Sequence, residues 1–202
     1  MMTKPKGVLL LGTSHAGKST SAAGLAAALD WRLISTDALS RHPGRPWAGA
    51  PDPVIEFYLG LSDDAIHWFL HVHHQNMRPL IGDAIEKAKR AGGFVLEGAA
   101  LRPEHLDDWD LDGVHPLCLF ADDAVLRGRI MAASGHEKRD DEMKRAIDKF
   151  IERSLRENRA LVAAARERGI DLVDVTDYGG ADRYFAALIG ELSAPEGAGS
   201  TS

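Results

Sequence analysis

The stretch GVLLLGTSHAGKSTSAAGLA, residues 7 to 26, constrains the fold more than any other part of the sequence. An apolar run leads into a loop bounded by Gly12 and Gly17, and small residues suited to a helix follow. The two glycines allow backbone conformations that are closed to other residues, so the chain can curl tightly between the two elements. The stretch therefore predicts a buried strand, a tight loop and a helix in direct succession.

Short apolar or β-branched runs alternate with helical segments along the rest of the chain. The expected strands are Val8–Leu11, Arg32–Ser35, Phe94–Glu97, Leu117–Phe120 and Asp171–Val175. Strands that alternate with helices need crossover connections, which predicts an α/β fold with a parallel sheet covered on both faces. We expect one domain over residues 1–192 and a disordered tail over 193–202, whose composition is rich in small and polar residues.

Two helical segments show a clear apolar stripe. Residues 77–93 place Leu80, Ile81, Ala84, Ile85 and Ala88 on one face and end at a pair of glycines. Residues 139–168 read as one long charged helix, with an inner stripe of Ile147, Phe150, Ile151, Ser154, Leu155 and Leu161. Residues 40–64 hold too many prolines and glycines for a long helix, so they form either a substrate-binding loop or lid, or an irregular surface connection.

The loop after the first strand has the pattern G-x-x-x-x-G-K-[ST]. Its backbone N–H groups and the start of the next helix point at one position, which favours a phosphate group there. Lys18 is suited to neutralising the β- and γ-phosphates, and the Ser19 hydroxyl is suited to binding Mg²⁺. The predicted nucleotide contacts are Gly12, Thr13, Ser14, His15, Ala16, Gly17, Lys18, Ser19 and Thr20.

Composition excludes several classes of protein. The net charge of −6 argues against a general nucleic-acid binder, which needs a cationic surface. No apolar stretch approaches the roughly 20 residues that cross a bilayer. Cys118 is the single cysteine and lies in an apolar run, so we expect a buried, unreactive thiol. With no secretory signal before the first apolar run, these features predict a cytoplasmic protein with no membrane or nucleic-acid partner.

Three motifs together resemble a known group. VLLLGTSHAGKST opens the chain, LISTD ends the second predicted strand and FVLEG ends the third. In this respect the sequence is similar to the small P-loop kinases, which include shikimate, gluconate, adenylylsulfate and nucleoside monophosphate kinases and chloramphenicol phosphotransferase. The resemblance spans roughly Gly7 to Asp177. It implies a P-loop NTPase three-layer α/β/α sandwich with a five-stranded sheet of order 2-3-1-4-5, ATP with Mg²⁺, and phosphoryl transfer to a small acceptor.

Two carboxylates follow predicted strands. The carboxyl ends of parallel strands line the ligand crevice, so Asp37 is expected near the phosphate loop. There it could take the proton of an attacking hydroxyl or hold Mg²⁺ through water, or it could cap the helix that begins at that point. Glu97 stands where P-loop proteins hold the Mg²⁺ shell, and it could contact the acceptor instead.

Arginines on the expected acceptor side suggest an anionic acceptor, because a guanidinium binds carboxylate or phosphate with two hydrogen bonds. The set comprises Arg41, Arg45, Arg78 and Arg102, and Arg102 is the closest of them to a strand end. Arg129 matches the arginine that stacks on adenine in nucleoside monophosphate kinases. The second arginine of that lid pattern is Ala133 here, so His136, Lys138 or Arg139 would have to supply its charge. Val175 and Thr176 are further candidate contacts to adenine.

Four histidines crowd into IHWFLHVHHQNMR. On a helix, His67, His71 and His74 fall on one face with a spacing that could hold a metal ion. Three imidazoles in a line along one helix cannot easily surround a tetrahedral ion, and no nearby carboxylate fits the same face. We therefore expect these histidines to be amphipathic residues beside Trp68 that lie near or line the acceptor pocket, with direct contact to the acceptor as an alternative.

The sequence thus predicts an ATP-dependent small-molecule kinase with Lys18, Asp37 and Arg102 as its catalytic residues. A nucleoside monophosphate kinase is the alternative within the same class. A non-kinase ATPase or switch is the alternative outside it, although neither a DxxG switch nor an NKxD motif is present.

Overall fold

The computed structural model describes residues 6–194 except residue 48. The predicted disordered tail falls mostly on residues 195–202, which lie outside the described residues. The strands are β1 (Gly7–Leu11), β2 (Arg32–Ser35), β3 (Phe94–Glu97), β4 (Val114–Phe120) and β5 (Asp171–Asp174). The helices are α1 (Lys18–Leu29), α2 (Asp52–Gly60), α3 (Asp63–Ala91), α4 (Asp123–Ser134), α5 (Asp141–Glu167) and α6 (Tyr178–Ser193), with 3₁₀ turns at Thr36–Ala38, Pro103–Asp108 and His136–Lys138.

The five strands form one sheet of order β2-β3-β1-β4-β5, and every neighbouring pair is parallel. The predicted fold class and strand order are confirmed. Because all strands run in the same direction, the loops after β1, β2 and β3 meet at one edge of the sheet. That edge receives the phosphate loop, Asp37 and Glu97.

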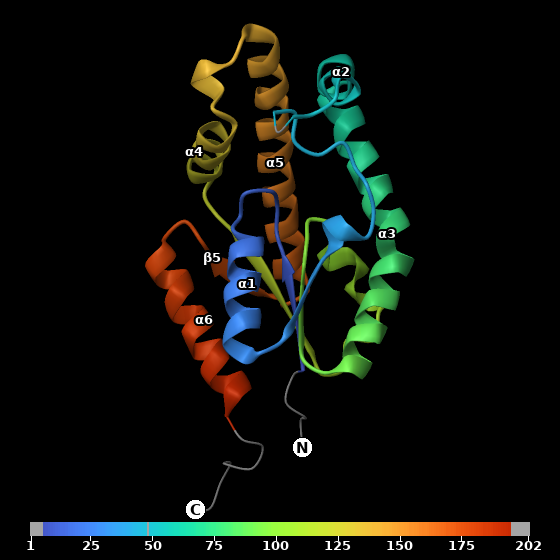
Figure 1. Ribbon diagram of the computed structural model, residues 1–202, viewed down its shortest axis with the longest axis vertical. Coiled ribbons are helices and arrows are strands. Elements are labelled where there is room, and N and C mark those ends of the chain that lie inside the picture. Colours follow the sequence, from blue (N-terminus) through green and yellow to red (C-terminus); the bar gives the residue numbers. More distant parts are fainter. Residues whose placement is uncertain (1–5, 48, 195–202) are drawn as a thin grey trace, which may run out of the picture.

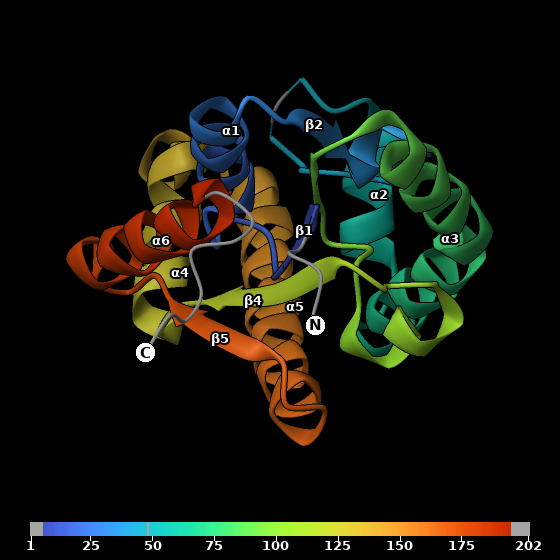
Figure 2. The ribbon, with the colours of Figure 1, turned by 90° about the horizontal axis from the view of Figure 1, so that it is seen from below.

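Helices cover both faces of the sheet (Figure 1). Seen from below, α1 and α6 lie on one side of the strands and α3 lies on the other (Figure 2). Successive residues of β1 alternate between the two layers, with Val8 and Leu10 in one apolar cluster and Leu9 and Leu11 in the other. All five residues of β1 are buried, as expected for the central strand of a sheet covered on both faces.

The helix α5 contributes to both layers. Its N-terminal half packs against α2 and α4, in the cluster that also holds residues of α1 and α6, whereas Leu161 and Ala165 belong to the other cluster, with Met77 and Ile81 of α3. The inner stripe predicted for this helix is buried along its whole length, and the polar residues Glu157 and Asn158 are buried with it. A single helix therefore contributes to both apolar clusters.

Some sequence-based boundaries differ from the structure. β4 begins at Val114, three residues before the predicted start, because Pro116 interrupts the apolar run without breaking the strand. The breaker-rich segment 40–64 contains the nine-residue helix α2, in which Pro53 occupies an early position that tolerates proline. Leu80 was placed on the inner stripe of α3, and this was wrong: it is 46% exposed, and Met77 takes the buried position.

Gly98, directly after β3, fixes how closely the ends of β2 and β3 approach each other. A Cβ at this position would lie 1.7 Å from the Thr36 hydroxyl oxygen, and the backbone φ of +159° is one that side chains rarely adopt. Thr36 is fully buried and cannot move aside without opening the sheet edge. The absent side chain is therefore what lets Asp37 and Glu97 share one crevice.

We expect Gly98→Ala to destabilise the protein by about 2 kcal/mol or more, since it adds both a steric clash and backbone strain. The matched control is Gly24→Ala on the exposed face of α1, where an added Cβ meets nothing within 4 Å. That control should stabilise the protein by about 0.5–1 kcal/mol. Chemical denaturation of both variants makes the comparison, and equal stabilities would refute the role given to Gly98.

Candidate active site

The loop after β1 wraps around the position where α1 begins. Gly12, His15 and Gly17 have φ angles of +143°, +63° and +80°, and these turns bring successive backbone N–H groups to one side. α1 starts at Lys18 with neither a capping side chain nor an acidic residue in its first turn. The positive end of this helix therefore remains available to an anion.

Two hydrogen bonds tie this loop to α5. The Thr13 hydroxyl donates to the backbone carbonyl of Ser154 over 3.1 Å, and the Arg153 guanidinium donates to the Ser14 hydroxyl over 3.2 Å. Arg153 also stacks on Phe150 at 4.2 Å and donates to the Tyr58 hydroxyl over 3.1 Å. These contacts attach the phosphate loop to α5.

Positive charge accumulates around the loop. The Lys18 ammonium is buried and donates to the Thr13 carbonyl over 2.8 Å, and burial lowers the pKa of this lysine. Burial also lowers the pKa of His15 to about 4, and the neighbouring charges of Arg45, Lys18, Arg153 and Arg129 act in the same direction. The cations that gather here, Lys18, Arg45, Arg129 and Arg153, favour an anionic ligand.

A pair of oxygen ligands lies beside the lysine. The Ser19 hydroxyl donates to Glu97 Oε2 over 3.3 Å, and Glu97 is buried at the end of β3. A hydroxyl and a carboxylate are hard oxygen donors, which suit Mg²⁺ better than a softer transition metal. Ser19 and Glu97 therefore fit a magnesium ion held at the phosphate loop.

Asp37 faces the same crevice from the end of β2. The hydroxyl of Ser35 accepts the hydrogen bond from the Asp37 amide, so Ser35 caps this turn and the Asp37 carboxylate is not needed as the cap. The neighbouring His42 lowers the pKa of Asp37, with Lys18 and Arg45 acting in the same direction and burial opposing them. The side chain is 70% exposed, and a substrate can reach it as an anion.

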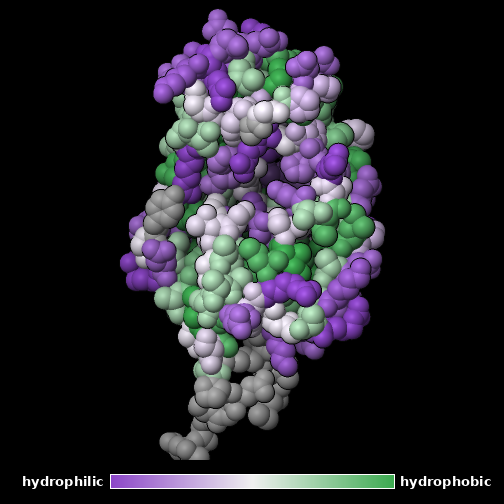
Figure 3. Space-filling view, viewed as in Figure 1, coloured by the Kyte–Doolittle hydropathy of each residue, from purple (hydrophilic) through white to green (hydrophobic). Residues whose placement is uncertain are grey.

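One cavity of about 240 Å³ brings these groups together. Its volume lies just below the range of roughly 300–1,000 Å³ found for small-molecule sites, so it suits a small ligand. Figure 3 shows a hollow surrounded by hydrophilic residues on this face of the molecule. Charged side chains from five different segments line the cavity, namely Lys18, Asp37, Arg45, Glu97, Arg153 and Glu157.

The four predicted acceptor arginines do not share this cavity. Arg45 lines it, whereas Arg41 is exposed on the same loop and is not among the lining residues. Arg78 pairs with Asp108 at 2.9 Å and lines a separate surface hollow beside Trp109. Arg102 is buried and bound to Glu157 and Glu104, so its guanidinium is occupied by two carboxylates.

Arg129, a predicted adenine contact, joins the phosphate loop to the loop after β5. Its guanidinium donates to the Val175 carbonyl over 2.6 Å and to the His15 carbonyl over 3.4 Å. The Thr176 hydroxyl accepts a hydrogen bond from the Asp122 amide over 2.8 Å. The loop after β5, the start of α4 and the phosphate loop are thereby joined.

The predicted lid residues have local partners. His136 lies 3.1 Å from Asp148, and Arg139 donates to the Ser134 carbonyl over 2.9 Å. Lys138 is exposed, and none of these three is among the described residues that line the cavity.

The sequence interpretation missed Arg153, Glu157 and the aromatic wall that Trp47 and Phe150 form beside His15. The ring centroids of Trp47 and Phe150 are 4.8 Å apart, and His15 lies about 6 Å from both. Arg153 and Glu157 adjoin the apolar stripe of α5. Polar side chains at core-facing spacing are the signal that could have identified them.

Comparison with known proteins agrees with this architecture. No family model matches the sequence, and no curated protein matches it. Among solved structures, a gluconokinase from Sinorhizobium meliloti 1021 is 20% identical with a TM-score of 0.54, over 93% of this chain and 95% of that one. An unliganded sugar kinase from Janibacter sp. HTCC2649 is 20% identical with a TM-score of 0.55, over 95% and 99% of the two chains.

A shikimate kinase from Acinetobacter baumannii in complex with shikimate is 15% identical with a TM-score of 0.50, over 96% of this chain and 97% of that one. The chain has the fold of the small P-loop kinases. At these identities the likeness concerns the fold alone. In addition, none of the helices within the described part of the chain has the length and apolar character to span a membrane.

The low pKa of His15 leads to a prediction for acid stability. The unfolded chain takes up a proton near pH 6.5, but folded His15 does so only near pH 4, so stability is lost as pH falls between these values. His15→Asn tolerates the left-handed backbone and removes this group. At pH 5 the variant should lose about 1 kcal/mol less stability than the native protein does, relative to pH 7.5, because the partial exposure of His15 to solvent reduces the effect of its pKa shift. Urea denaturation at both pH values measures this difference, and equal losses would contradict the assignment.

Proposed function

We propose that this protein is an ATP-dependent kinase that transfers the γ-phosphoryl group to a hydroxyl of a small anionic acceptor. The observation that carries the proposal is the shared cavity, in which Lys18 and Ser19 of the phosphate loop face Asp37 and Arg45. A phosphate site alone would serve many nucleotide-binding proteins. A carboxylate and further cations across the same small cavity are what an acceptor requires.

The phosphate loop and Lys18 would hold the β- and γ-phosphates of ATP. Their N–H groups and ammonium are placed before the reaction, so little reorganisation is needed as negative charge shifts in the transition state. A magnesium ion bound by Ser19 and Glu97 would supply further neutralisation of phosphate charge. Arg129 and the loop at Val175 and Thr176 would bind the nucleotide base, because they lie together on the far side of His15.

The acceptor would bind between the phosphate loop and α3. Asp37 would accept or orient the proton of the acceptor hydroxyl. The hydroxyl oxygen would bond to the γ-phosphorus while the bond between the γ-phosphorus and the β-phosphate oxygen breaks, leaving ADP. Arg45 and Arg153 would bind the negative group of the acceptor, since both line the cavity. Arg41, Arg78 and Arg102 then have no direct part, because Arg102 is occupied by carboxylates and the other two lie outside the lining.

The similar solved structures include a gluconokinase and a shikimate kinase, which supports a hydroxy acid as acceptor. A nucleoside monophosphate would use the same arginines and belongs in the same screen.

The direct test is a screen for ADP production from ATP with small hydroxy acids, neutral sugars and nucleoside monophosphates as acceptors. We expect turnover to rise sharply with at least one anionic acceptor. Lys18→Ala should reduce that turnover by about 100-fold or more, because it removes a buried cation from the phosphates, while the fold stays intact by circular dichroism. Turnover that no small molecule stimulates would reject the kinase assignment, as would near-normal activity of Lys18→Ala.

Asp37→Asn separates the role of this carboxylate from that of the nucleotide site. An amide keeps the shape but cannot accept the proton, so kcat should fall by about 100-fold or more while the Kd for ATP changes little. Steady-state kinetics with the best acceptor, together with calorimetric titration of ATP, give the two numbers. A parallel loss in kcat and ATP affinity would make Asp37 a residue of the metal or nucleotide site instead.

A further inference from the structure

Three ligand-type atoms from two helices converge at a point that the proposed transfer reaction does not use. His67 Nδ1 and His71 Nε2, on α3, lie 3.8 and 3.9 Å from Glu157 Oε2 on α5. All three atoms lie within 4.8 Å of one another. Separations of 3.8 and 3.9 Å are too long for hydrogen bonds, so these contacts do not satisfy the groups by themselves.

Each of these atoms is also buried without a hydrogen-bond partner among the described residues. Glu157 as a whole is only 4% exposed. An unsatisfied buried polar atom costs about 1–3 kcal/mol, and a folded protein rarely leaves three of them pointing at one another. The arrangement therefore calls for a group that all three can bind at once.

We propose that His67, His71 and Glu157 form a binding site for a divalent transition-metal ion of the zinc type, which joins α3 to α5. Imidazole nitrogens and one carboxylate oxygen are the donor set that zinc accepts, with water in a fourth position. Bonds of about 2.1 Å at a tetrahedral angle place ligand atoms about 3.4 Å apart, so the three atoms, which lie within 4.8 Å of one another, need to close by at most about 1.4 Å.

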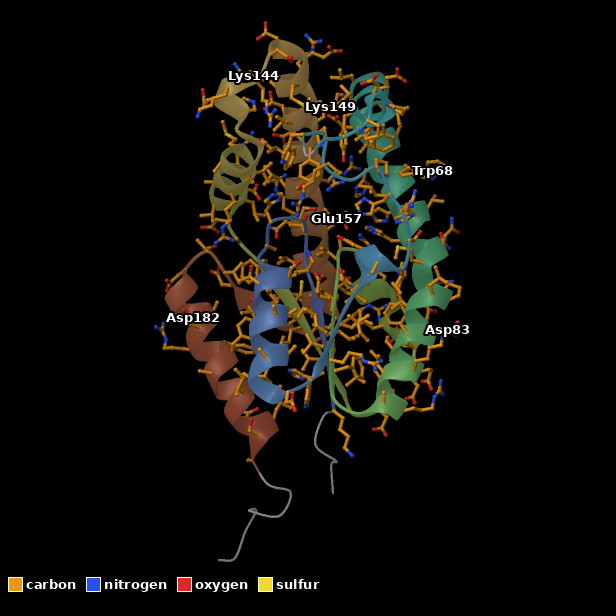
Figure 4. All side chains as sticks on the ribbon, viewed as in Figure 1. Trp68, Asp83, Lys144, Lys149, Glu157 and Asp182 are labelled. Atoms are coloured by element: carbon orange, nitrogen blue, oxygen red, sulfur yellow. The ribbon has the colours of Figure 1, made fainter. Side chains whose placement is uncertain are left out.

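The local geometry suits this role. His67 and His71 are one helical turn apart, which puts both rings on the same face of α3 with centroids 4.3 Å apart. Figure 4 places Glu157 on α5 near the middle of the molecule, whereas Trp68, next to His67 in sequence, points outward from α3. The third ligand thus comes from the facing helix. The three ligands therefore do not lie in a line along one helix, and they can surround a tetrahedral ion. His74 is not part of the site.

The charges around the site also permit a cation. Arg102 donates to the other carboxylate oxygen of Glu157 and is itself bound by Glu104, so these three groups together carry a net negative charge. Arg156 is the other nearby cation, and it pairs with Asp64 at 2.6 Å. Arg102 then fixes the orientation of Glu157, as groups behind a metal ligand commonly do.

The site would stiffen the acceptor side of the cavity. α3 supplies Leu70, His73 and Met77 to the cavity wall, and α5 supplies Arg153 one turn before Glu157. An ion that binds only the folded arrangement of the two helices stabilises it by mass action.

The test uses the full-length, tag-free protein after treatment with a chelator. It is titrated with Co²⁺ and with Zn²⁺ in excess Mg²⁺, which occupies oxygen sites such as Ser19 and Glu97. We expect one equivalent of Co²⁺ to give the intense visible absorption of a four-coordinate ion, Zn²⁺ to displace it, and either ion to raise the melting temperature.

His67→Ala and His71→Ala should each weaken binding by more than about 100-fold, beyond the 10–100-fold typical of residues behind the ligands. Glu157→Gln should weaken binding to the same extent. If this buried substitution harms folding, the two histidine variants still test the site, because His67 and His71 lie at partly exposed helical positions. The matched control is His115→Ala, which removes an imidazole 3.3 Å from Asp171 outside the site. It should bind like the native protein.

No binding by the native protein, or undiminished binding by both histidine variants, would overturn the proposal. Lys18→Ala should still bind one equivalent. Because no readout depends on turnover, failure here is distinct from failure of the proposed kinase activity.

Discussion

The shape and charge of the candidate active site depend on how the buried Lys18 ammonium is held at the carboxyl edge of the sheet. β1 delivers the lysine there, the curled loop supplies the Thr13 carbonyl as its partner, and α1 directs its uncapped N-terminus at the same position. Removing this ammonium from water is unfavourable, and the arginines around His15 add to the positive potential. This gathering of buried positive charge favours an anionic ligand at the carboxyl edge of the sheet.

α5 binds the loops around this site through polar side chains and a backbone carbonyl. Along one face it receives the Thr13 hydroxyl at Ser154, extends Arg153 to Ser14, and donates from Asn158 to the Ala121 carbonyl over 2.9 Å. Glu157 lies on the same face and holds Arg102. A helix whose core-facing positions are polar is costly to bury, and here the polar groups bind the loops that form the cavity. Packing and function therefore use the same side chains.

The strand-linked residues were predictable because a parallel sheet converts sequence position into spatial position. Asp37 follows β2 and Glu97 is the last residue of β3, so the sheet order alone brings them to the phosphate loop. The arginines were not predictable in this way. Arg45, Arg78 and Arg102 look alike in sequence, yet one lines the cavity, one pairs with Asp108 on the surface and one is buried between carboxylates. Long side chains on loops and turns take positions that depend on which partner is nearby.

The sequence by itself determined the α/β class, the five strands and the phosphate loop, because local patterns of glycine and apolar residues encode them over a few turns of chain. It did not determine α2, which lies in a segment rich in prolines and glycines. Only the tertiary structure decided which charges meet: Arg153 with Ser14, and Glu157 with Arg102, His67 and His71. These residues are separated by 55 or more positions along the chain. Electrostatic and ligand interactions act through space over a few ångströms, and no pattern local to the sequence records them.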